Sequence, residues 1–331
     1  MSSTLVGAGL AAATAPVQRR VRGYFAPVNR ATGTPTIFDP AQLGTFTLNA
    51  PPSPWVDLGW CTEFTRTCGT KIGAVRTGSP LTTQSQVRTE LSTTVQVNFE
   101  NWGKLQLALA SGSEQMNLLV TAQGATANGS GGVAATAIPL VTATGGSTAT
   151  SLQVGSAAAG LFNVGDLVAV DLDYTGQIGF VGSGVSAAYV SAATNVSNDV
   201  NYIRRVTLNV GRVVAIAGGA LQLGEGLLAG VPVTGMSVSR LSGFVDREGG
   251  TFFQEWSGLF CVDGEQGDRV LFHYPRLQTT RGSGEKVESL AGPLTLLKLA
   301  AAFQALPVRD ENDGQLTVCF RSYLPGPMRS V

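Results

Sequence analysis

The sequence predicts a mainly β protein with one helix that flanks a sheet. Apolar and polar residues alternate in many short segments, as strands with one buried face require. Glycine is abundant, at 42 of 331 residues, and only 13% of the residues are charged. Glycine supplies turns between short strands, and the apolar spacing changes to the three-and-four pattern of a helix only near residue 100. Together these features favour sheets over helices.

The stretch from Leu241 to Leu277 carries a strong strand signal and reads LSGFVDREGGTFFQEWSGLFCVDGEQGDRVLFHYPRL. Phe252 and Trp256 share one face of the predicted strand, whereas Leu259 lies on the other. Residues 263–268 supply a turn before a second strand. A hairpin with apolar side chains on both faces needs a cover on each, from its own chain or from a neighbouring subunit.

The charge balance argues against nucleic-acid binding and for self-association. Lys and Arg total 22, and Asp and Glu also total 22, so no net basic field is present. A charged share of 13% beside a hydrophobic share of 44% is low for a soluble monomer. We therefore expect other copies of the chain to cover much of the surface, including the aromatic hairpin.

Residues 1–54 are expected to form an extended N-terminal arm. The segment is rich in proline, and several arginines precede the first acidic residue, Asp39. Such a basic arm is either disordered or lies on a neighbouring subunit. The apolar segment LVGAGLAAATA resembles the core of a signal peptide, but its positive charges come after it, whereas a signal peptide has them before it. Cytoplasmic synthesis is therefore expected.

Residues 55–122 and 240–325 are expected to form the core domain. A strand is predicted from Trp55 to Ala74, followed by a polar hairpin loop over 75–90 and another strand over 91–97. A helix is predicted over 98–111, NFENWGKLQLALAS, with Asn98 as its N-cap and Gly112 as its C-cap.

Two further segments complete the predicted organisation. Residues 123–239 are expected to be an inserted outer β-domain, with a Gly-, Ala- and Thr-rich linker followed by short alternating strands. Residues 293–306, PLTLLKLAAAFQAL, are ambiguous, because their composition favours a helix whereas their alternation favours a strand. We expect a strand there, and a closing strand over 315–323.

No constellation of residues predicts catalysis, a metal or a cofactor. The one histidine, His273, lies in an aromatic strand with no nucleophile motif near it. The spacing of Cys61 and Cys68 fits no common zinc site, and the cysteines are expected to be reduced thiols. Acids over 166–173 and 246–255 have neither calcium-loop spacing nor a setting typical of a glycosidase pair. We therefore expect a protein that is not an enzyme.

Three stretches carry a resemblance to a known family. They are LGWCTEFTRTCGTKIGAVRTG, FENWGKLQLALASGS, and FFQEWSGLFCVDGEQGDRVLFHYPRLQ followed by LTLLKLAAAFQALPVRDENDG. In their order and organisation, about 50–122 and 240–325 resemble the tail tube (major tail) proteins of long-tailed bacteriophages and related prophages. Residues 123–239 depart from a minimal tube subunit.

The resemblance implies a tail-tube β-sandwich or barrel fold and a structural function. Subunits would form rings, usually of six, that stack into a tube through which DNA passes without specific binding. The N-terminal arm and the 75–90 loop would reach the next ring, and the helix would flank the barrel. A trimeric ring of duplicated subunits is the alternative, but the helix motif is not repeated.

The same resemblance implies partners, a location and interface residues. The partners would be other copies of the chain, the tape-measure protein and the tail-tip or terminator proteins, with no membrane involved. The protein would be assembled in the host bacterial cytoplasm and reside in the virion tail. The residues expected at subunit interfaces are Arg19, Arg20, Arg22, Arg76, Arg88, Phe252, Trp256, Phe260 and Tyr274.

Two other functions remain open from the sequence. Exposed Trp and Tyr side chains on a β-face can stack on sugars, so a carbohydrate-binding or hydrolytic receptor-binding tail module is one alternative. A capsid or decoration protein is the other.

Overall fold

The computed structural model describes residues 20–28, 34–52, 54–120, 138–141, 146–171, 209–227, 230–232, 235–247, 255–264, 267–280 and 299–325. The chain divides into two compact units. The first comprises residues 1–28, 35–102 and 255–331, and the second comprises residues 29–34 and 103–254. Most described residues belong to strands, which confirms the prediction of a mainly β protein.

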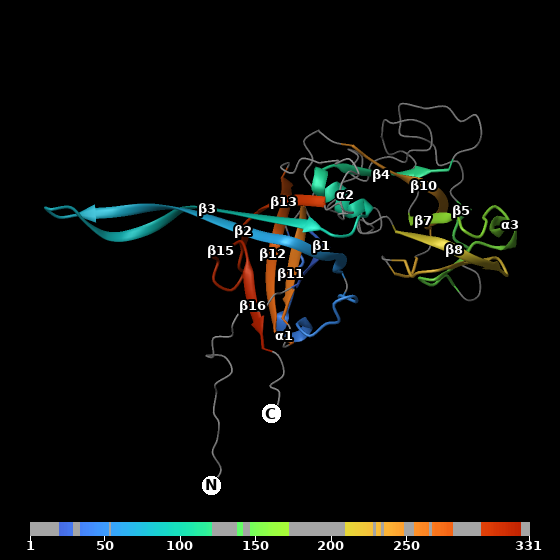
Figure 1. Cartoon of the computed structure of the whole chain (residues 1–331), viewed down its shortest axis with the longest axis horizontal. Coiled ribbons are helices and arrows are strands. Elements are labelled where there is room, and N and C mark those ends of the chain that lie inside the picture. The colour runs from blue at the N-terminus through green and yellow to red at the C-terminus, as the bar shows by residue number, and fades with distance from the viewer. Residues whose placement is uncertain are drawn as a thin grey trace, which may run out of the picture. The chain divides into compact units, whose positions relative to one another are not determined.

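A closed circuit of antiparallel strands forms the first unit (Figure 1). The strands follow the order β11, β1, β2, β3, β13 and β12, and β12 pairs back with β11. Their bounds are β1 Arg20–Pro27, β2 Val56–Thr77, β3 Thr82–Phe99, β11 Glu255–Asp263, β12 Arg269–Thr280 and β13 Leu299–Ala305. We call this circuit the barrel.

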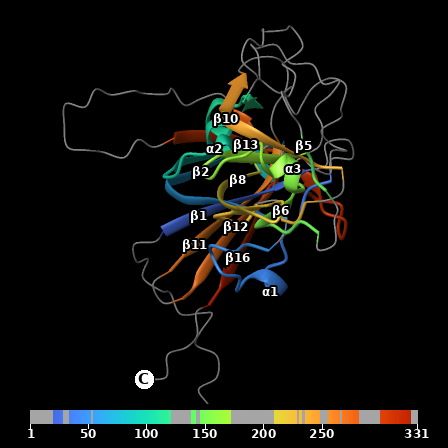
Figure 2. The ribbon, with the colours of Figure 1, turned by 90° about the vertical axis from the view of Figure 1, so that its right-hand side faces the viewer.

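Shorter elements extend the barrel. β16 (Phe320–Leu324) pairs with the part of β12 that β13 leaves open, and β14 (Val308–Arg309) pairs with β15 (Leu316–Thr317). The short helix α1 (Pro40–Leu43) is capped by Asp39, whose carboxylate accepts the Ala41 amide hydrogen at 2.8 Å. In both views α1 lies close to the ends of β11 and β16 (Figures 1 and 2).

The barrel interior is filled by aromatic rings from β1, β11, β12 and β13. Phe25 of β1 lies 6.2 Å from Trp256, 6.1 Å from Phe260 and 5.3 Å from Phe303, between ring centroids. Tyr274 lies 6.1 Å from Phe260 in an edge arrangement. All five side chains have 0% exposure, so the interior is a packed core of mutually tilted rings.

The outer face of β1 and β11 is covered by the segment between β1 and β2. Phe38 and Trp55 from this segment pack on Tyr24 and Leu259 of the two strands, together with Leu271 of β12. The Tyr24 hydroxyl donates a hydrogen bond to the carbonyl oxygen of Leu48 at 2.8 Å. The described part of the aromatic hairpin is therefore covered on both faces by its own chain, except near its end, where Phe272 is only partly buried.

This burial corrects two expectations. The hairpin does not need another copy as a cover, because residues 36–55 fill that role. The described part of the expected arm over 1–54 is not an arm, because β1 lies in the middle of the sheet, between β11 and β2. The strand was not predicted because the alternation in RVRGYFAP is short and the residues that pair with it lie far away in the sequence, at Val56 and beyond. Residues 1–19 lie outside the described part.

The second unit contains a separate antiparallel sheet with its own core. Its strand order is β4, β10, β7, β8, β9 and β6, and β5 pairs with β10. Val168, Val213 and Leu221 are fully buried in the core of this sheet. The bounds are α2 Lys104–Ser111, β4 Glu114–Leu119, β5 Ile138–Pro139, β6 Ser151–Gln153, α3 Ser156–Ala159, β7 Leu167–Asp171, β8 Val210–Ala217, β9 Ala220–Leu223 and β10 Ser237–Arg247.

The second unit is larger than the insertion predicted over 123–239. β4 pairs with β10 from Glu114↔Arg247 to Leu119↔Leu241, which joins both strands to the second sheet. Residues 103–122 and 240–254 therefore belong with the second unit and not with the barrel. The sequence signal did not separate β10 from the hairpin strand that follows it, because both alternate in the same way.

Three local predictions have clear outcomes. The helix begins at Lys104 and not at residue 98, because Asn98 and Phe99 remain in β3, opposite Ala300 and Leu299 of β13. Gly112 is its C-cap, with a φ of 69°, as predicted. Residues 299–305 of the ambiguous segment form a strand, also as predicted, whereas 293–298 lie outside the described part.

Candidate functional site

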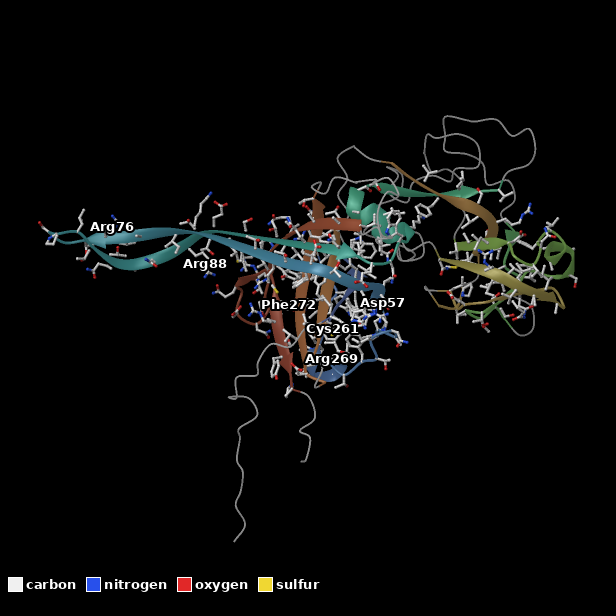
Figure 3. The ribbon with its side chains drawn as sticks, in the orientation of Figure 1. Asp57, Arg76, Arg88, Cys261, Arg269 and Phe272 are labelled. Carbon is white, nitrogen blue, oxygen red and sulfur yellow. The ribbon has the colours of Figure 1, made fainter. Side chains whose placement is uncertain are left out.

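A long ribbon formed by β2 and β3 extends beyond the barrel of the first unit (Figure 3). Pairing of β2 with β3 continues to Thr77↔Thr82, so most of the predicted polar loop over 75–90 belongs to a two-stranded ribbon. Every residue from 67 to 90 is exposed except Gly73, which is partly buried. We call residues 67–90 the distal ribbon. Its exposed apolar side chains include Ile72, Val75, Leu81 and Val87, each at least 50% accessible.

Local chemistry explains why this segment pairs with itself. Both strands are rich in threonine and valine, which favour extended backbone. The connecting turn begins at Gly78, whose φ of 96° suits glycine, and the Thr82 hydroxyl donates to the carbonyl oxygen of Thr77 at 3.1 Å. Lys71 and Glu90 form an ion pair across the two strands.

The two faces of the distal ribbon differ in charge. Alternation along β2 places Ile72 and Arg76 on one face, and Arg88 lies opposite Ile72 in the register. Neither guanidinium forms an ion pair or hydrogen bond with the residues that the structure describes. The other face carries the neutralised Lys71–Glu90 pair. One face therefore carries two arginines without acidic partners among the described residues, and Ile72 lies beside Arg88 on that face.

A groove of about 970 Å³ opens where β1 begins and β11 ends. Phe64 and Phe272 line it with their rings 5.3 Å apart, and Trp60 lines it from β2. Glu63 and Glu100 also line it, and we call it the barrel-end groove.

Charged groups of both signs surround this groove. The guanidinium groups of Arg66 and Arg321 lie 6.0 Å and 5.5 Å from the centroid of Phe272, one of its lining rings. Asp263 accepts a hydrogen bond from Arg269 Nε at 3.1 Å, which neutralises that carboxylate. Glu63 accepts a hydrogen bond from the Asn98 amide at 2.7 Å, and neither Glu63 nor Glu100 forms an ion pair within the described ranges. Arg20 is the one cation in the lining, and its guanidinium lies 4.8 Å from the Trp60 ring centroid.

Arg22 is held inside the first unit beside this groove. Its Nε donates to Asp57 at 3.0 Å, its Nη2 bonds the same carboxylate, and its guanidinium lies 5.1 Å from the Trp60 ring centroid. The hydrogen bond to Asp57 raises the pKa of Arg22. Asp57 also accepts the Gly59 amide hydrogen at 2.8 Å. Arg22 therefore binds residues of its own barrel and is not part of a free arm.

His273, Cys61 and Cys261 are buried in apolar surroundings, whereas Cys68 is exposed and Cys319 is partly buried. Burial lowers the pKa of His273 to about 4, and its ring lies 5.7 Å from that of Trp55. Burial also raises the pKa of Cys61 to about 12 and that of Cys261 to about 11, so both thiols stay protonated near neutral pH. Within the described ranges, no cluster of three or more His, Cys, Asp or Glu residues could hold a metal.

Apart from Arg22, which is held by Asp57, the residues predicted at subunit interfaces fall into three groups. Arg76 and Arg88 are exposed on the distal ribbon, and Arg20 lines the barrel-end groove. Arg19 and Phe252 lie outside the described part. The expectation that another copy covers the hairpin aromatics is wrong, because the barrel interior already buries them completely, and these residues are Trp256, Phe260 and Tyr274.

Sequence reasoning did not single out Glu63, Glu100 or Trp60 as members of one site. Trp60 and Glu63 lie in a stretch that was interpreted only as a strand, and Glu100 follows the end of β3. Pairing of Cys61 with Phe99 brings these segments together. Only the register of β2 against β3 could have revealed the cluster.

Comparisons with known proteins give no family assignment. No protein-family model matches the chain, and no curated protein matches it significantly. Among the described residues, no helix has the length and apolar character needed to cross a membrane.

Proposed function

We propose that this chain is a non-enzymatic structural subunit of a bacteriophage tail tube. Copies would form rings that stack into a conduit for DNA. Its partners would be other copies of the chain, the tape-measure protein and the tail-tip or terminator proteins, and it would reside in the virion tail. The resemblance of residues 50–122 and 240–325 to tail tube proteins suggests this family.

The exposed distal ribbon is the observation that carries the proposal. A two-stranded ribbon open to solvent on both faces is at best marginally stable alone, because its faces bury no apolar surface. Its two edges also present unpaired backbone groups to other chains. A surface of this kind is explained if another copy covers it in an assembly. Uncovered side chains such as Ile72 and Val87 would then be buried.

The aromatic hairpin does not support the proposal, because its own chain covers both of its faces. The same burial removes the reason for a carbohydrate-binding function based on this hairpin. Trp256 has 0% exposure and so has no face to offer a sugar. The proposal therefore depends on the ribbon and not on the hairpin.

Assembly of the purified full-length chain tests the proposed function. We expect rings or tubes in negative-stain electron microscopy, and large species in sedimentation velocity that increase with protein concentration. A chain that remains monomeric at high concentration would contradict the proposal.

A further inference from the structure

We infer that Cys68 and Cys319 form a reversible disulfide when a peroxide reaches the folded chain, so that the rim of the barrel is a site of oxidative modification. Cys68 lies in β2 at the base of the distal ribbon, and Cys319 lies between β15 and β16. Both are free thiols in the structure. The bond lies within one chain, so it forms whether or not copies of the chain assemble.

Cys68 faces the inner side of the sheet at the barrel rim. It lies opposite Thr93 in the register of β2 against β3, and the Thr93 hydroxyl donates a hydrogen bond to its sulfur at 3.4 Å. Thr93 is fully buried on the same face of β3 as the core residues Val95 and Val97. Because directly opposed residues share a face of the sheet, Cys68 continues this inner face to the point where it meets solvent.

Cys319 reaches the same rim through Tyr274. The Tyr274 hydroxyl accepts a hydrogen bond from Arg66 Nε at 3.1 Å and is also hydrogen-bonded to the Cys319 thiol. Arg66 lies two residues before Cys68 on β2, so both side chains project from one face of the strand. Cys68 is also near enough to Cys319 for its negative charge to raise the pKa of that thiol. The two sulfurs therefore belong to one cluster around Arg66 and Tyr274.

The difference in exposure between the two thiols sets the order of the reaction. Cys68 is exposed and meets the peroxide first, whereas Cys319 is partly buried. The Cys68 sulfur attacks one peroxide oxygen and becomes a sulfenic acid, the O–O bond breaks, and the other oxygen leaves as water with the thiol proton. The Cys319 sulfur then attacks the sulfenic sulfur, the S–O bond breaks, and a second water leaves with the Cys319 proton. Two thiols lose two electrons, and one peroxide becomes two waters.

Nearby cations favour the second step. Burial raises the pKa of Cys319, and the positive charges of Arg66 and Arg321 oppose this shift because they stabilise the thiolate. Neither guanidinium forms an ion pair with another residue in the described part of the chain. Their charge is therefore available to the attacking sulfur.

The bond would attach the last strand of the first unit to the base of the ribbon. β16 lies at the edge of its sheet, where it pairs with β12. Residues 318–319 lie outside any strand, so the backbone there can adjust to bring the sulfurs to bonding distance. A covalent link between positions so far apart in sequence closes a long loop and restricts the unfolded chain. Oxidation should therefore stabilise the first unit and slow the opening of β16.

Disulfide mapping of the full-length chain is the direct test. The reduced protein is treated with a small excess of hydrogen peroxide, blocked with N-ethylmaleimide and digested, and its peptides are compared by mass spectrometry with and without dithiothreitol. We expect one linked pair of peptides, which contains Cys68 and Cys319, from a chain that migrates as a monomer in non-reducing gels. Amide hydrogen exchange in β16 should slow by roughly fivefold or more, and dithiothreitol should reverse the change.

Substitution of each cysteine separates the two steps. In Cys319→Ser, the oxidised Cys68 has no second thiol, so dimedone should trap its sulfenic acid, whereas the wild-type chain should give little adduct. Cys68→Ser should consume peroxide roughly tenfold more slowly, because its remaining thiols are buried or partly buried. Cys261→Ala removes a buried thiol and is the matched control, which should form the bond as the wild-type chain does.

Other patterns of oxidation would overturn this disulfide. They are a linked pair that includes Cys61 or Cys261, a disulfide between two chains, and a sulfenic acid that persists on Cys68 of the wild-type protein. Equal rates of peroxide consumption by the wild-type chain and Cys68→Ser would show that Cys68 is not the thiol that reacts first. Unchanged hydrogen exchange in a chain that carries the bond would contradict its effect on β16.

Discussion

At the residue scale, His273 shows how burial sets the protonation of a side chain. It is 4% exposed, with its ring near Trp55 and Phe320, and its Nε2 lies 3.3 Å from the Thr36 carbonyl oxygen. Desolvation of the charged imidazolium lowers the pKa from 6.5 to about 4, although the hydrogen bond to Thr36 opposes the shift. The histidine is therefore neutral in the folded barrel at physiological pH.

This depressed pKa predicts a loss of stability in acid. Above pH 6.5 His273 is neutral in both states, whereas between pH 6.5 and about 4 the unfolded chain binds a proton that the folded chain does not. Stability should therefore fall as the pH drops through this range, by about 3 kcal/mol at most for this group. Urea denaturation at several pH values between 7.5 and 4.5 measures the effect.

The variant His273→Gln is the control for this prediction, because glutamine does not titrate but keeps an N–H donor for Thr36. Its free energy of unfolding should fall less between pH 7.5 and 4.5, by on the order of 2 kcal/mol. Carboxylates titrate equally in both proteins, so their contribution cancels. Parallel pH profiles for the two proteins would show that His273 does not control this dependence.

At the element scale, β11 illustrates a strand buried on both faces. Its inner face meets Phe25 of the neighbouring strand β1, and its outer face meets Tyr24 and the 36–55 segment. Gly258 lies at a close approach in this strand, since an added Cβ would lie 2.4 Å from Leu277 Cδ1. Because Leu277 is fully buried, it has little room to move.

Gly258→Ala is therefore expected to destabilise the first unit by about 1–3 kcal/mol through overpacking. Gly69→Ala on β2 is the matched control, because its new Cβ would meet only the Ser92 carbonyl oxygen at 3.9 Å. The control should be neutral or slightly stabilising. Urea denaturation of both variants measures the difference, and equal stabilities would contradict the packing described for β11.

At the scale of the whole molecule, we expect the distal ribbon to be needed for assembly but not for folding. Residues 72–89 can be replaced by an Asn-Gly turn that joins Lys71 to Glu90, which already face each other. The free energy of unfolding should change by less than about 1 kcal/mol, because the removed residues lie outside the buried core. Assembly into rings or tubes should be lost.

Circular dichroism with urea denaturation, beside sedimentation velocity and negative-stain microscopy, checks both parts of this prediction. The point substitution Arg76→Lys keeps the ribbon and its charge and should assemble normally. If truncated chains form tubes as well as the wild-type chain does, the ribbon has no role in the proposed assembly.

Local patterns predicted much of the fold. The turn over 263–268 and the strands on either side of it follow from alternation and turn residues, and β11 and β12 occupy those positions. Gly112 ends a helix because it alone fits the left-handed C-cap there. Residues 299–305 form a strand although their composition favours a helix, because β3 and β12 pair with them on both sides.

The candidate site was less predictable. Arg76 and Arg88 were expected at an interface, but the barrel-end groove was not foreseen, because β2–β3 pairing and the ends of β1 and β11 bring its residues together. Arg22 was interpreted as part of an arm because the short segment RVRGYFAP gives little signal of its own. Its partner Asp57 lies 35 residues away.

Composition and periodicity alone determined that this chain is mainly β and poor in charge. Which side chains are covered was decided only in three dimensions. Trp256 and Ile72 are both apolar side chains on strands, yet the barrel encloses the first and leaves the second in solvent. Alternation predicts which side chains share one face of a strand, but only pairing with distant strands determines what lies against that face.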